Sequence, residues 1–169
     1  METRTRPLSP PRLTEGDFML DEKEIIEMLH CDSPKTIQTK GVQLALQKED
    51  LSFVMYYSSN PEYGDNCALI FTSLDYCRSE QYLDDLFSWI EDLNAVGAIR
   101  IFEYLIAAPA KLLLKSFLIA LEAAVKRKNK AMIDTLLSIL EQNGDLCDLI
   151  KDNEVALRWL EKTEDGENH

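Results

Sequence analysis

The stretch Asp84–Ile99, DDLFSWIEDLNAVGAI, decides the fold class, because it carries one apolar helix face up to a turn and begins the next. Apolar residues recur at spacings of three and four along it and just before it, at Leu83, Leu86, Phe87, Ile90 and Leu93. Such spacing places side chains on one face of an α-helix, so we expect an amphipathic helix packed on a core. Asn94 is a good N-cap for the following segment, AVGAIRIFEYLIAA. The stretch therefore predicts a helix, a turn and a second helix.

The chain on either side of this stretch shows the same pattern. Asp21 predicts the cap of a helix at 21–30, and Ser33-Pro34 predicts the start of another. Asn143-Gly144 predicts a helix end, and the last helical segment has a candidate break near 152–153. The only candidate strand, FVMYYSS, is short. We therefore expect an all-α fold of about eight or nine helices, paired as antiparallel helical hairpins and stacked as an αα-solenoid.

Length and composition predict one folded domain. The chain has 169 residues, of which 46% are hydrophobic, and this is enough to bury a substantial core. Residues 1–18 are proline-rich and read as a flexible N-terminal extension, 19–162 as a single helical domain, and 163–169 as a frayed tail. Whether Met1 or Met19 is the natural start stays open.

Charge, cysteines and hydropathy exclude several classes of protein. A formal net charge of −12 argues against nucleic-acid binding and suits a basic partner. No apolar run reaches the roughly 18 residues of a membrane span. The four cysteines form no CxxC pair, so we expect no structural metal site and no disulfide framework, and we interpret the cysteines as small core residues. These features predict a reduced, cytoplasmic protein.

Signs of catalysis are weak. The two histidines, His30 and His169, lie far apart, and no phosphate-loop, dinucleotide or nucleophile-elbow motif is present. Carboxylate pairs could serve hydrolysis or hold a cation, but they fall on polar helix faces, where solvation is the default: Asp84 with Asp85, Glu91 with Asp92, and Asp145 with Asp148. We therefore predict no catalytic residue, no metal site and no cofactor.

The charges are divided into blocks along the chain. Asp75–Asp92 holds six acidic residues and one basic, Lys111–Lys130 holds six basic and one acidic, and Glu141–Glu167 holds nine acidic and three basic. An acidic patch steers a basic partner toward it. The alternative interpretation is that these are ordinary solvated faces.

A family resemblance rests on two motifs. Asn66-Cys67-Ala68, followed after a helix by Tyr82–Asn94, resembles a pattern of small bacterial helical proteins, N-C-A and then W-[IL]-x-D-[LM]-N. The resemblance covers about residues 19–108, and the carried motif residues are Trp89, Asp92 and Asn94. It implies HEAT-like helical repeats and a role as an immunity or toxin-neighbour protein. This chain departs from the pattern where Ala95-Val96 replaces a Trp-Pro pair.

The function that we expect is non-enzymatic protein–protein interaction. An immunity protein of this kind would occlude a basic partner such as a toxin, with aromatic anchors such as Trp89 or Trp159 at the centre of the contact. The residues predicted to meet the partner are Asp84, Asp85, Trp89, Glu91 and Asp92. Two alternatives stay open: a carboxylate- or metal-dependent hydrolase, and a self-associating scaffold.

Overall fold

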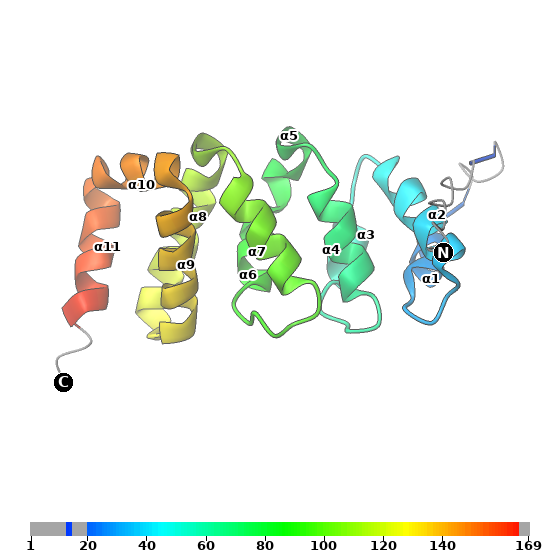
Figure 1. Cartoon of the computed structure of the whole chain (residues 1–169), viewed down its shortest axis with the longest axis horizontal. Helices are drawn as coiled ribbons and strands as arrows, with labels where there is room; N and C mark the ends of the chain where they lie inside the picture. Colours follow the sequence, from blue (N-terminus) through cyan, green and yellow to red (C-terminus); the bar gives the residue numbers. More distant parts are fainter. Residues whose placement is uncertain (1–12, 15–19, 166–169) are drawn as a thin grey trace, which may run out of the picture. The chain divides into compact units, whose positions relative to one another are not determined.

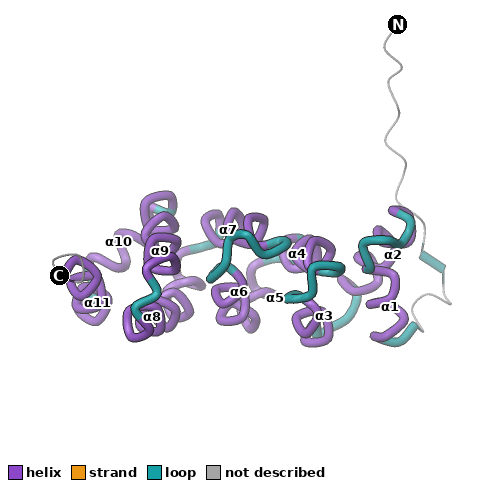
Figure 2. The backbone as a smooth tube through the Cα atoms, turned by 90° about the horizontal axis from the view of Figure 1, so that it is seen from below, coloured by secondary structure: helices purple, strands orange, loops and turns teal. Residues whose placement is uncertain are grey.

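A computed structural model describes residues 13–14 and 20–165, with side chains up to residue 161. All regular structure in this part of the chain is helical, which confirms the all-α prediction (Figures 1 and 2). The candidate strand FVMYYSS was a wrong alternative, because its first five residues lie within helix α3 (Ser52–Tyr57). The predicted N-terminal extension lies almost entirely outside the described residues, as does the end of the predicted tail. No helix among the described residues is both long and apolar enough to cross a membrane.

Contacts among the described residues form two compact units, the second of which begins at Phe71. The single domain predicted over 19–162 stays a prediction. The first unit contains α1 (Glu22–Leu29), α2 (Lys35–Leu46), α3 and most of α4 (Gly64–Thr72). The second contains α5 (Tyr76–Ser79), the 3-10 helix η2 (Glu80–Tyr82), α6 (Leu83–Trp89), α7 (Ala98–Ala107), α8 (Ala110–Arg127), α9 (Lys130–Gln142), α10 (Gly144–Lys151) and α11 (Glu154–Asp165). The described residues thus hold more helices than the eight or nine expected.

In the first unit, α1 and α2 pack against each other. Asp21 begins α1 as predicted, since its side chain accepts a hydrogen bond from the Glu24 amide and the Asp21 amide donates one to the Glu24 side chain. Gly41 lets the two helices approach closely: a Cβ atom there would lie 2.8 Å from Met28 Cβ. Ser33 is not the cap of α2 that we predicted, because Pro34 occupies that position and the Ser33 hydroxyl donates to the Glu27 carbonyl instead.

In the second unit, the long helix α8 is the packing centre, and it contacts α6, α9, α10 and α11. Phe87 of α6 and Phe117 of α8 are buried and meet edge to face, with ring centroids 6.1 Å apart. Asn143 is the buried junction between α9 and α10: its side chain accepts from the Leu146 amide and donates to the Ile106 and Ala108 carbonyls at the end of α7. Asn143 was predicted to end a helix, and it also begins the next.

The connection between α6 and α7 differs from the prediction. Helix α6 ends at Trp89, and Asn94 does not cap α7, since the chain makes further turns before α7 begins at Ala98. The residue before α7 is Gly97, whose φ of 84° is in the left-handed region that glycine enters at little cost. Gly97 reverses the chain direction before α7. The Asn94 side chain instead donates a hydrogen bond to the Asp92 carboxylate within the loop.

Candidate functional site: an acidic groove in the second unit

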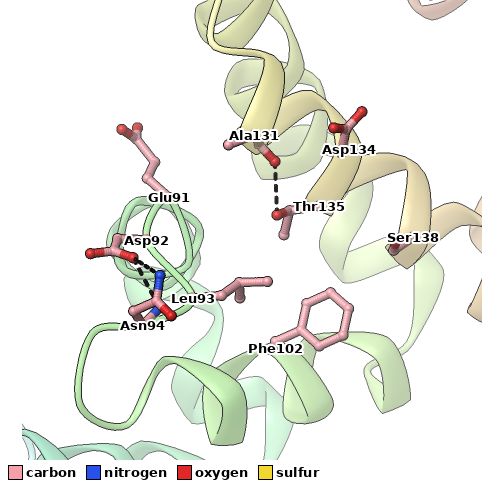
Figure 3. Close-up of a pocket in the computed structure, with 9 residues that line it drawn as sticks. All are labelled: Glu91, Asp92, Leu93, Asn94, Phe102, Ala131, Asp134, Thr135 and Ser138. Carbon is pink, nitrogen blue, oxygen red and sulfur yellow. Dashed lines mark hydrogen bonds between the residues drawn. The ribbon is translucent and has the colours of Figure 1, made fainter.

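A groove of about 370 Å³ lies between the α6–α7 loop and the first half of α9, with α7 beneath it. The loop contributes Glu91–Asn94, α7 contributes Phe102, and α9 contributes Ala131, Asp134, Thr135 and Ser138. Figure 3 shows Leu93, Phe102 and Thr135 pointing into the space between the loop and α9, whereas the carboxylates of Asp92 and Asp134 point away from it. The groove therefore has an apolar interior and an acidic rim.

Hydrogen bonds hold both walls in place. In the loop, an Asp92 carboxylate oxygen accepts from the Asn94 amide at 2.9 Å and from the Asn94 side chain at 3.2 Å. On α9, the Thr135 hydroxyl donates to the Ala131 carbonyl at 3.0 Å, so the Thr135 methyl group is the part that meets the apolar interior. These bonds orient the side chains of Asp92, Asn94 and Thr135.

One carboxylate of the rim already has a cation beside it. Glu91 Oε1 lies 3.1 Å from an Arg127 guanidinium nitrogen at the end of α8, and the Glu91 and Arg127 side chains are 37% and 65% exposed. An ion pair with this much exposure contributes little stability, typically about 0.2–1 kcal/mol. A second cation can therefore compete for Glu91 at small cost.

The structure brings together only part of the predicted partner-binding set. Glu91 and Asp92 line the groove. Asp84 and Asp85 are exposed on the first turn of α6, outside its lining. Trp89 is 9% exposed, and its indole N–H donates to the Val96 carbonyl at 3.1 Å, which ties α6 to the turn before α7. This geometry gives Trp89 a packing role, and its contact with a partner stays a prediction.

Three groove residues had no signal in the sequence that we could have used. Phe102 and Thr135 read as ordinary members of apolar helix faces, and Asp134 read as a single solvated carboxylate. Only the packing of α7 on α9 places them opposite the Glu91–Asn94 loop. Knowledge that α7 packs on α9 would have been needed to predict the site.

The cysteine interpretation holds for one residue only. Cys67 is fully buried, whereas Cys31 and Cys77 are exposed and Cys147 is intermediate. The prediction that the cysteines are core residues was therefore wrong for Cys31 and Cys77, because Cys31 lies in the turn after α1 and Cys77 faces outward on the short helix α5.

The lining of the groove determines which kind of ligand it suits. Within the described part of the chain, the carboxylates of residues 84–92 join no group of three side chains close enough to share a metal ion. An apolar hollow with separated carboxylates at its edge instead suits a ligand that has an aliphatic stem and a cationic end. Comparisons with protein-family models, with curated proteins and with solved structures find no match for this chain.

Proposed function

We propose that this protein is a non-enzymatic interaction module whose groove in the second unit takes a basic segment of a protein partner. The observation that carries the proposal is the combination of an apolar interior, Leu93 and Phe102, with the rim carboxylates Glu91, Asp92 and Asp134. A surface of one charge sign attracts and orients a partner of the other sign.

The occupant that best fits is an arginine or lysine side chain. Its methylene groups would lie against Leu93 and Phe102, while its charged end would stay at the rim near Glu91 or Asp134. Asp84 and Asp85, together with a net charge of −12, would add long-range attraction before contact. Contacts in the groove would then set specificity, and the surrounding charge would set the rate of association.

The more specific part of the proposal is an immunity role in the bacterial cytoplasm. The resemblance of Asn66–Ala68 and Trp89–Asn94 to helical proteins with HEAT-like repeats supports it. Consecutive contacting helices, such as α1 with α2 and α8 with α9, are the pairing that HEAT-like stacking requires. In this role the protein would cover the active site of a basic toxin.

The test is capture of the partner by the tagged chain from cells that co-express the products of the neighbouring genes. We compare the unmodified protein with the triple variant Glu91→Gln, Asp92→Asn, Asp134→Asn. These changes keep side-chain size and remove three charges from the rim, so we expect partner affinity to fall about tenfold or more, consistent with one or two charge pairs lost.

A charge-matched control separates the groove from general attraction. The variant Glu141→Gln, Asp145→Asn, Asp152→Asn also removes three carboxylates, all exposed and outside the groove lining. We expect it to retain the partner. Equal losses in both variants would show that only net charge matters, and the absence of any captured protein would contradict the interaction proposal. Failure to protect cells from an adjacent toxin would remove the immunity role alone.

A further inference from the structure

The turn after α1 brings together a histidine, a thiol and a carboxylate. One donor atom from each of His30, Cys31 and Asp32 lies within 4.8 Å of the other two. His30 Nδ1 is 3.9 Å from Asp32 Oδ2, and Cys31 Sγ is 3.8 Å from Asp32 Oδ1. Cys31 and Asp32 are exposed, and the His30 side chain is 26% exposed, so all three are reachable from solvent.

The hydrogen bonding of His30 selects one tautomer of its ring. The Asp32 amide donates to Nδ1 at 3.1 Å, so the neutral ring carries its proton on Nε2. That nitrogen lies 3.4 Å from a carboxylate oxygen of Glu62, in the loop before α4. A carboxylate beside the protonated nitrogen is the usual support of a metal-binding histidine, since it orients the ring and leaves the other nitrogen as the ligand.

Two side-chain amides, those of Gln38 and Asn66, hold the backbone of this turn. Gln38, only 3% exposed, donates to the Cys31 and Ser33 carbonyls at 2.9 and 2.7 Å. The Asn66 side chain donates to the Leu29 carbonyl and to the Gln38 side-chain oxygen. The Cys31 amide donates to the Glu62 carbonyl at 2.8 Å. The backbone carbonyls of this turn are therefore held, while Cys31 and Asp32 are exposed and His30 is partly exposed, which is the organisation that a binding site needs.

We propose that His30 Nδ1, Cys31 Sγ and the Asp32 carboxylate bind a zinc-like divalent transition metal, with Glu62 as the positioning residue. Imidazole, thiolate and carboxylate together suit zinc better than calcium or magnesium, which prefer oxygen ligands alone. This site lies within the first unit and is separate from the groove, so the two proposals fail independently.

Binding follows a balanced exchange of ligands. The Cys31 thiol loses its proton to solvent, and the new sulfur–metal bond replaces one metal–water bond. The His30 ring turns away from the Asp32 amide, so that the lone pair of Nδ1 ligates the metal and a water molecule takes the place of Nδ1 at that amide. With three protein ligands, the ion keeps at least one water molecule.

The first experiment titrates the purified protein with cobalt(II), a coloured substitute for zinc. We expect a thiolate-to-cobalt charge-transfer band that zinc abolishes by displacement. Cys31→Ser removes the band, whereas Cys77→Ser, the matched control at the other exposed cysteine, leaves it unchanged. Glu62→Gln keeps the band and weakens binding by about tenfold, as expected for a supporting carboxylate. No band, or a band that survives Cys31→Ser, overturns the proposal.

A second experiment uses the unmodified chain and needs no variant. Alkylation of Cys31 and Cys77 by iodoacetamide is followed by peptide mass spectrometry, with and without zinc. We expect zinc to slow modification of Cys31 about tenfold or more, because a metal-bound thiolate is a poorer nucleophile, and to leave Cys77 unchanged. Equal rates at Cys31 with and without zinc contradict the site.

Discussion

The Arg127 guanidinium lies 3.1 Å from the Glu91 carboxylate, so the rim of the groove holds a cation supplied by the chain itself. Arg127 belongs to the basic block Lys111–Lys130, whereas Glu91 belongs to the acidic block Asp75–Asp92. Their contact shows that neighbouring surfaces of opposite sign meet beside the candidate site, and that a basic partner must share Glu91 with Arg127.

Replacing Arg127 should strengthen binding of a basic ligand. In Arg127→Gln, Glu91 is released from an exposed ion pair worth about 0.2–1 kcal/mol, so affinity should rise by up to about fivefold. Fluorescence anisotropy with a short labelled arginine-rich peptide measures this change. Lys126→Gln is the matched control, since it removes the same charge from the preceding residue, which pairs with Glu122. Equal gains in both variants would assign the effect to net charge.

Trp89→Phe should lower the free energy of unfolding by about 1–2 kcal/mol. The change removes the hydrogen bond from the indole N–H to the Val96 carbonyl and leaves that acceptor without its donor. Urea unfolding, followed by circular dichroism, measures it. Trp89→Ala should cost more, about 3–5 kcal/mol, because it also leaves a cavity. If Trp89→Phe stays folded and still loses the partner of the groove, Trp89 contacts that partner directly.

Two glycine substitutions should have opposite outcomes. Gly41→Ala places a Cβ atom 2.8 Å from Met28 Cβ and 3.1 Å from Leu29 Cδ2, so α1 and α2 must move apart. The expected cost of about 1–3 kcal/mol exceeds the gain of up to about 1 kcal/mol in helix propensity. Gly144→Ala meets no atom within 4 Å and should be neutral or slightly stabilising. Thermal unfolding of both variants and of the unmodified protein measures these changes. A Gly41→Ala protein as stable as the unmodified one would contradict the close packing of α1 on α2.

The free energy of unfolding should fall at alkaline pH, because the folded protein keeps the Cys67 thiol and the Tyr104 hydroxyl protonated. Burial raises the pKa of the Cys67 thiol from 9.0 to about 12, and burial likewise raises the pKa of Tyr104. A raised pKa in the folded state means that the unfolded chain loses the thiol proton first. The stabilisation is therefore complete below about pH 9 and is lost as the pH rises toward 12.

Urea midpoints measured across this pH range test the assignment to Cys67. In Cys67→Ala the decline should be shallower than in the unmodified protein, by up to about 1.4 kcal/mol per pH unit for the one proton removed. Cys77→Ala is the control, because that thiol is exposed and should leave the slope unchanged. An identical slope in Cys67→Ala would assign the alkaline loss to other groups.

The sequence predicted those helix ends whose signals are local. Asp21 and Glu24 lie within one turn of each other, so their reciprocal hydrogen bonds could be expected from spacing alone. The same argument failed at Asn94, because Gly97 provides the reversal before α7 and the chain uses two more turns to reach it. A cap-forming residue indicates a possible start, but the neighbouring backbone decides whether the start is used.

The sites required contacts between distant residues. Glu91 and Asp92 could be proposed from their charge, whereas Phe102 and Asp134 join them only through the packing of α7 on α9. His30 was dismissed because no second histidine lies near it in the sequence. The residue that supports His30 is Glu62, and the fold of the first unit brings a Glu62 carboxylate oxygen to 3.4 Å from His30 Nε2.

Asn143 also has a consequence for how the second unit opens. One buried amide joins the ends of α7 and α9 to the start of α10, so none of these ends can fray while its hydrogen bonds persist. Amide hydrogen exchange near these three ends should therefore share a single opening rate, and any protease that cuts there must wait for the same event. The connection between α9 and α10 is short and exposed at Gly144, yet its backbone opens only when the hydrogen bonds of Asn143 break.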